Sequence, residues 1–227
     1  MELPSPRRVS RLQEDDEAAG EGIGRILALS DGVFAIAITL LVIQIALPAT
    51  AEADVLPSAL LRLWPRYLAY VLSFLVIARF WVAHHLAFRL IARYDSMLVW
   101  LNLLLLMFVA FLPFPTAVLG EHLAAPPAAV LYATAVGLTS AASAGFWWYS
   151  SGRSWLLKSG LDPLQVKILR ARSLAGPVFF ALTLPLAAYA PYAAEAAWTV
   201  GFPLARTAVV RYVTARSQQS RGSGEHR

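Results

Sequence analysis

The sequence predicts an all-α membrane protein with six transmembrane helices per chain and both termini in the cytoplasm. Hydrophobic residues make up 58% of its 227 residues, and the mean hydropathy of +0.59 is far above that of a soluble domain. The apolar residues fall into separate runs, most of them long enough to cross a hydrocarbon core of about 30 Å as a helix. The basic residues gather at alternating ends of these runs, a pattern typical of membrane topology.

Composition and motifs exclude several classes of protein. The chain has no cysteine, so it offers no disulfide, thiol nucleophile or thiolate metal site. The net charge of +5 does not come from a basic stripe with interleaved aromatics, so we expect no nucleic-acid partner. No zinc-protease, nucleophile-elbow or phosphate-loop motif occurs, and the adjacent His84 and His85 would point about 100° apart on a helix. We therefore expect no enzyme, no cofactor and no fixed metal site.

The first half of the predicted bundle begins after a polar stretch. Residues 1–22 mix arginines with acidic residues, which is unlike a signal peptide, and are expected to form a disordered or weakly helical cytoplasmic tail. The first helix is expected at 23–47, before Pro48, and the second at 64–88 after a short loop at 49–62.

The second half contains the prolines that limit its helices. The third helix is expected at 97–119, where the Pro-Phe-Pro-Thr sequence at 113–116 should kink or end it. The fourth helix, 127–150, is rich in small residues that let neighbouring helices approach closely. A basic loop then leads to the fifth helix, 168–190, and a proline and an arginine interrupt the sixth, 193–214.

Basic residues set the predicted orientation. They crowd the N-terminal tail, the turn between the second and third helices, the loop between the fourth and fifth, and the C-terminal tail. The positive-inside rule therefore places both termini in the cytoplasm, which requires an even number of spans. We expect one transmembrane domain at 23–214 and a disordered cytoplasmic tail at 215–227.

The first helix carries polar residues that a simple membrane anchor would not contain. On a helical wheel, an aliphatic line forms one face, while Ser30 and Asp31 lie well over 100° away from Ile36. An ionisable group in hydrocarbon costs several kcal/mol unless it has a partner. We therefore expect this helix to have a function beyond anchoring the chain. The aliphatic line, which can be a packing face as well as a pore lining, comprises Leu29, Gly32, Ile36, Thr39, Leu40 and Ile43.

Polar residues of the second and third helices are predicted at the same membrane depth as Ser30 and Asp31. A shared network of Asp31 with His84 and Asn102 is the favoured interpretation, because buried polar groups in lipid need partners. Alternatively, each side chain bonds to a nearby backbone carbonyl or reaches the membrane interface. Asp31 and the histidines can also be read as a proton relay.

Two sequence blocks resemble one known family. The first block, 25–45, resembles the signature first helix of prokaryotic relatives of the lysosomal potassium channel called transmembrane protein 175. Its Arg-x-x-x-Phe-Ser-Asp motif is matched by Arg25, Ser30 and Asp31, with Leu29 in place of the phenylalanine. The second block, 80–122, shares further family residues, which are Trp81, His84, His85, Asp95, Trp100, Asn102 and the 113–116 sequence.

The resemblance implies a potassium-permeable cation channel without a carbonyl-loop filter. In that family the first helix lines the pore, and bacterial members of six helices assemble as homotetramers in the cell membrane. On matching positions the pore line would be Ile36, Thr39, Leu40 and Ile43, with potassium bound only transiently near Thr39. The interhelical polar network that ties the first helix to its neighbours would comprise Arg25, Ser30, Asp31, Trp81, His84 and Asn102.

Two other functions remain open at this stage. A proton-coupled transporter would use Asp31 and His84 to move a substrate against its gradient. An accessory membrane protein would conduct nothing.

Overall fold

The computed structural model describes residues 6–46 and 56–201, with side chains from 19 to 46 and from 56 to 199. In these ranges the chain is helical, and β-structure is limited to an isolated bridge between Ile91 and Leu157. The elements are α1 (Pro6–Ile43), α2 (Leu56–Arg62), α3 (Trp64–Phe88), α4 (Ser96–Phe111), α5 (Pro113–Glu121), α6 (Pro126–Ser151), a 3₁₀ turn (Ser154–Leu156), α7 (Pro163–Tyr189), α8 (Pro191–Ala196) and a π-helical turn (Ala197–Gly201).

Five segments of the described chain are long and apolar enough to cross a membrane. They correspond to the first five predicted helices and comprise Ala19–Ile43, Trp64–Phe88, Ser96–Glu121, Pro126–Ser151 and Pro163–Tyr189. Only residues 193–201 of the predicted sixth helix fall within the described residues, and the predicted tail at 215–227 lies outside them. The sixth span and the cytoplasmic location of both termini therefore stay predictions.

The first helix begins before the predicted residue 23, within the stretch expected to be disordered or weakly helical. The helix begins at Pro6, so most of the stretch predicted as a tail is helical. Proline suits the first turn, where its missing N–H has no intrahelical partner, and residues 7–18 are mostly good helix formers. At the other end the helix stops at Ile43, before the predicted limit of 47.

Two predicted loops contain helical residues. Leu56–Arg62 forms the short helix α2 within the loop expected at 49–62. Helix α7 begins at Pro163 instead of 168, because the Asp162 carboxylate caps it by accepting the Leu164 backbone N–H at 2.9 Å. Three basic residues expected in the preceding loop, Lys167, Arg170 and Arg172, therefore lie on α7.

The prolines at 113–116 divide the third predicted span as expected. Helix α4 ends at Phe111 and α5 begins at Pro113, whose ring cannot donate a backbone hydrogen bond. The Thr116 backbone N–H donates to the Leu112 carbonyl at 3.2 Å, so this carbonyl keeps a partner at the break. The same span continues to Glu121.

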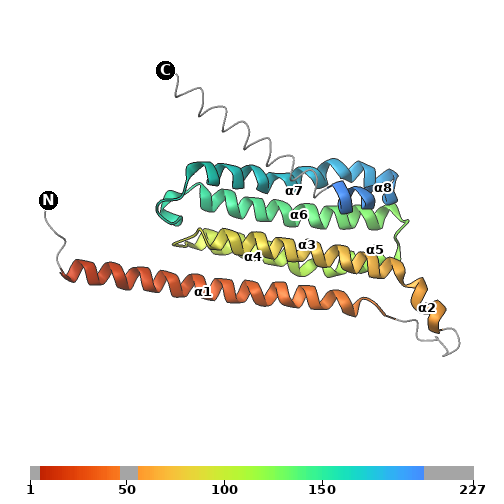
Figure 1. Cartoon of the computed structure of the whole chain (residues 1–227), viewed down its shortest axis with the longest axis horizontal. Helices are drawn as coiled ribbons and strands as arrows, with labels where there is room; N and C mark the ends of the chain where they lie inside the picture. The colour runs from red at the N-terminus through yellow and green to blue at the C-terminus, as the bar shows by residue number, and fades with distance from the viewer. Residues whose placement is uncertain (1–5, 47–55, 202–227) are drawn as a thin grey trace, which may run out of the picture.

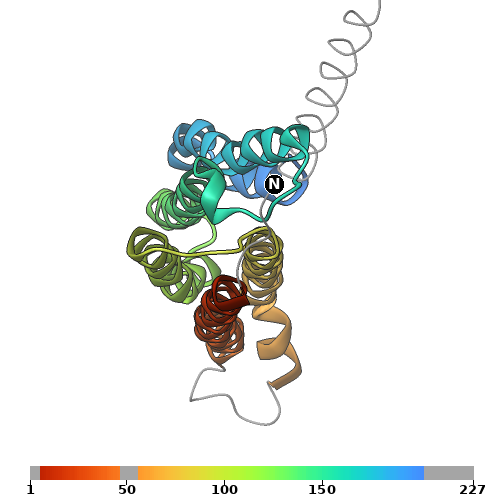
Figure 2. The same cartoon turned by 90° about the vertical axis from the view of Figure 1, so that its left-hand side faces the viewer.

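The axes of the membrane-spanning helices run roughly parallel or antiparallel to one another, and α1 lies at one side of this bundle. Figure 1 shows α1 running along α3 and α4, while α6 and α7 lie beyond them. The end-on view in Figure 2 places α6 between the α3–α4 pair and α7. Because α1 touches the bundle on one side only, its opposite face is free of contacts with the rest of the described chain.

A close approach fixes α3 against α5. A Cβ atom added to Gly120 would lie 3.2 Å from the Cα atom of Arg66 and 3.4 Å from the Cβ atom of Ala69. Arg66 of α3 also connects α5 and the residues after α1 at this end of the bundle. Its guanidinium donates to the Ala46 carbonyl at 2.7 Å and forms an ion pair with Glu121 at 3.1 Å.

Candidate pore helix and its polar contacts

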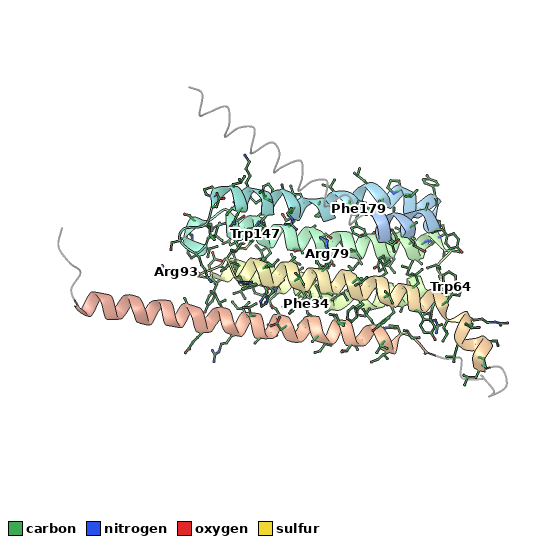
Figure 3. All side chains as sticks on the ribbon, viewed as in Figure 1. Phe34, Trp64, Arg79, Arg93, Trp147 and Phe179 are labelled. Atoms are coloured by element: carbon green, nitrogen blue, oxygen red, sulfur yellow. The ribbon has the colours of Figure 1, made fainter. Side chains whose placement is uncertain are left out.

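The apolar face of α1 identified on the helical wheel is exposed in the single chain. Ile36 and Ile43 keep 60% and 69% of their surface accessible, and Leu40 keeps 39%. The opposite face is buried against α3, α4 and α5 through side chains that recur every three or four residues, namely Ser30, Phe34, Ala37 and Leu41. Phe34 is labelled in Figure 3, on the side of α1 that faces the bundle. Helix α1 therefore packs against the bundle through one face and leaves its aliphatic face exposed.

Thr39 supplies an exposed hydroxyl within the aliphatic line. Its Oγ1 donates to the Ile36 carbonyl at 2.9 Å, one helical turn back. The hydroxyl proton is therefore used within α1, and the oxygen lone pairs remain available as acceptors. Such an oxygen can interact with a cation that has lost part of its water shell.

A buried chain of hydrogen bonds joins α1 to α4 and α3. The Asn102 amide donates to the Ser30 hydroxyl at 3.1 Å, and its carbonyl oxygen accepts from His84 Nε2 at 2.7 Å. Ser30 in turn donates to the Ile26 carbonyl at 2.8 Å. All three side chains are almost fully buried, so these bonds lie in the interior of the bundle.

Asp31 does not belong to this chain of bonds. Its carboxylate accepts from the Trp81 indole N–H at 2.8 Å, which makes a second, more exposed link between α1 and α3. Ser30, and not Asp31, occupies the position on α1 that meets Asn102, so Asp31 has no direct hydrogen bond to His84 or Asn102 within the described residues. A shared role of these side chains in one network stays a prediction. Arg25 is exposed on α1 and takes part in neither set of bonds within the described residues.

A third polar group, missed from the sequence, is also buried in the bundle. Thr116 donates to Ser73 at 2.8 Å, and Ser73 donates to the Tyr132 hydroxyl at 3.1 Å, so α5, α3 and α6 are linked. Hydroxyl side chains in helices commonly bond to their own backbone, so their spacing gave no signal of this contact. Among the described residues, no three His, Asp or Glu side chains gather as a metal site.

Asp95 organises the turn between α3 and α4. It caps α4 by accepting the Leu98 backbone N–H at 2.8 Å and accepts the Tyr149 hydroxyl of α6 at 2.6 Å. Partial burial raises the pKa of this carboxyl, but the bonds from Tyr149 and Leu98 and the nearby Arg153 together hold the pKa below its ordinary value. Arg153 also stacks over the Tyr149 ring at 3.8 Å.

We expect Asp95→Ala to destabilise the purified protein by about 1 kcal/mol at neutral pH, the usual cost of a lost N-cap. Because the folded-state pKa of Asp95 is lowered, its stabilisation is full above the unfolded pKa and is lost as the pH falls through the folded value. Thermal unfolding in detergent should thus separate wild type from variant at pH 7, and the difference should shrink progressively as the pH falls below about 4, the ordinary pKa of an aspartate. Tyr149→Phe keeps the cap and serves as the control; an equal difference at both pH values would contradict the prediction.

The fold and the site together define a polytopic α-helical membrane protein in which polar contacts hold the first helix. The family model described as "Endosomal/lysosomal potassium channel TMEM175" matches residues 25–113. A protein named potassium channel from Streptomyces collinus is 42% identical over 168 residues, which cover 72% of this chain and 82% of the relative. The chain belongs to the TMEM175 family.

Two further similarities are to proteins from Chamaesiphon minutus. A protein named potassium channel from Chamaesiphon minutus is also 42% identical over 168 residues, covering 72% of this chain and 83% of its own length. The crystal structure of a lysosomal potassium-selective channel TMEM175 homolog from the same organism has a TM-score of 0.70 at 36% identity. The match covers 87% of this chain and 98% of that chain. These relatives are named as channels and not as enzymes.

Proposed function

We propose that this protein is a potassium-permeable channel that conducts ions passively along the exposed face of α1. The observation that carries the proposal is the aliphatic line of α1, left uncovered in a helix that is firmly docked on its other side. The names of its relatives support potassium as the permeant ion. Ile36, Leu40 and Ile43 form the constriction, and Thr39 offers its hydroxyl oxygen to the ion.

The pore requires several copies of the chain, since one α1 helix cannot enclose a water-filled path. We propose a homotetramer in the cell membrane, with α1 from each copy around a common axis and the remaining helices outside. Exposed aliphatic side chains then line the axis instead of facing lipid. Because water leaves a narrow apolar constriction readily, small rotations of α1 would open or close the path by changing its wetting.

Ion flux into liposomes that contain the purified full chain tests this function. We expect potassium to flow down its gradient without a proton gradient, and faster than sodium. Flux that depends on a proton gradient, and that ends when Asp31 is neutralised, would favour a proton-coupled transporter instead. Against that alternative, Asp31 bonds to Trp81 while His84 bonds to Asn102, so no direct hydrogen bond links the two titratable groups in the described structure.

In this proposal the polar contacts set the position of the pore helix. Ser30 and Asp31 face away from the aliphatic line and bind α1 to α4 and α3. Their loss should change assembly or opening without changing which ion passes. Arg25 lies near the N-terminal end of the membrane-spanning part of α1, Ala19–Ile43, where the ion path meets the predicted cytoplasm.

We expect Asp31→Ala to weaken the docking of α1 by about 1 kcal/mol, the net worth of a typical hydrogen bond. The fraction of tetramer or the open probability should fall, while the ratio of potassium to sodium flux stays as in wild type. Size-exclusion chromatography and single-channel recording measure these quantities. Trp81→Phe should reproduce the effect, and the double variant should add little to it; a normal tetramer with altered selectivity would argue against this role.

A further inference from the structure

A cavity of about 410 Å³ lies between α3, α6 and α7, apart from the exposed face of α1. It falls in the half of the bundle where α3 and α6 end and α7 begins, which is the predicted cytoplasmic half. Its size is within the usual range of small-ligand sites. Its lining includes the polar side chains of Arg79, His84, Arg89, Trp147, Gln165 and Arg172.

The lining is strongly cationic. Arg79 on α3, Arg89 directly after α3 and Arg172 on α7 line one space, and none of the lining residues that the structure describes is acidic. Within the described residues, Arg89 and Arg172 form no ion pair. Guanidinium groups at membrane depth are costly without a counter-charge, so the convergence of Arg89 and Arg172 indicates that an anion neutralises them.

The cavity also contains hydrogen-bond donors that are buried without acceptors. The Trp147 side chain is only 5% exposed, yet its indole N–H has no partner within the described structure. The Nε atom of Arg172 is likewise buried without an acceptor. Since buried polar atoms are nearly always hydrogen-bonded, these two donors point to a ligand that supplies acceptor oxygens. Figure 3 labels Trp147 on α6 and Arg79 on α3.

We propose that this cavity binds a phosphate group, carried by an anionic lipid headgroup or free in solution. Arginine forms paired hydrogen bonds to phosphate oxygens, and a phosphate supplies the negative charge that the lining lacks together with acceptors for the Trp147 and Arg172 donors. Arg89 follows the last residue of α3, near the depth of headgroup phosphates, and basic pockets between transmembrane helices are typical sites for such headgroups. His84 lines the same cavity and bonds to Asn102, so the ligand would lie one residue away from the contacts of α1.

Native mass spectrometry of the purified full chain tests the site without relying on ion flux. The protein is titrated with phosphatidylglycerol, with phosphatidylcholine and with inorganic phosphate. We expect phosphatidylglycerol to bind at least tenfold more tightly than phosphatidylcholine. Arg89→Gln with Arg172→Gln should reduce this affinity at least tenfold, whereas Lys167→Gln should not change it, because that exposed lysine lies on α7 but outside the cavity.

Each outcome of this titration decides the proposal. Binding of inorganic phosphate that depends on the same arginines identifies a free phosphate as ligand, and binding of phosphatidylglycerol alone identifies a lipid headgroup. Equal binding of both lipids, no binding of any probe, or an arginine variant that binds like wild type would overturn the site. If the double variant does not fold, Arg172→Gln alone replaces it. A non-conducting protein that still binds phosphate would contradict the channel proposal and leave this site intact.

Discussion

Replacing Ile36 or Ile43 by alanine is expected to raise potassium flux into liposomes about tenfold. In the proposed tetramer each residue forms a ring of four aliphatic side chains, and both stand exposed on α1. Alanine removes most of each ring and widens the apolar constriction, so water and ions enter it at a lower cost. A tenfold change corresponds to a barrier lowered by about 1.4 kcal/mol. Because neither side chain packs within its own chain's core, folding should be unaffected.

Val42→Ala provides the matched control for these two variants. Val42 is also an exposed aliphatic residue of α1, at 53% accessibility, but it lies about 120° away from Ile36 around the helix. Its truncation should leave the flux unchanged. Normal tetramers in which Ile36→Ala and Ile43→Ala conduct like wild type would remove these residues from the pore line, and equal gains in all three variants would indicate a general loosening of α1.

The limits of the spans could be predicted where long apolar runs end in charge or proline. Trp64–Phe88 begins and ends as expected, and α6 differs by one residue at each end. Charged segments were harder to place, since Arg, Lys and Glu form helices as readily as loops when they flank an apolar run. For this reason the starts of α1 and α7 were placed too late.

The two faces of α1 could be predicted from the period of the helix. The residues of neighbouring helices that bond to Ser30 and Asp31 could not. The wheel places Ser30 and Asp31 about 100° apart, so neighbouring helices decide which of them meets Asn102. The structure gives this position to Ser30 and leaves Asp31 to Trp81. The cationic cavity was hidden for a similar reason. Its arginines come from residues 79, 89 and 172, which lie near one another only because α6 packs against both α3 and α7.

Asn102→Leu is expected to destabilise the protein by about 1–3 kcal/mol, the cost of leaving a buried polar group without its partner. Asn102 is the centre of the buried chain of bonds, since it accepts from His84 and donates to Ser30. Leucine nearly fills the same volume, so the effect would come from the lost hydrogen bonds and not from a cavity. Ser30 keeps its bond to the Ile26 carbonyl, so the polar group left without a partner is mainly His84 Nε2.

Thermal unfolding in detergent should therefore show a melting temperature several degrees lower for Asn102→Leu. Ser30→Ala should have a smaller effect, because it removes one bond and leaves the pair of Asn102 and His84 intact. In a double-mutant cycle, adding Ser30→Ala to Asn102→Leu should cost less than it does in wild type, since the bond between them is already lost. Additive effects would show that α1 is held by packing around Phe34 and Leu41 instead of by this bond.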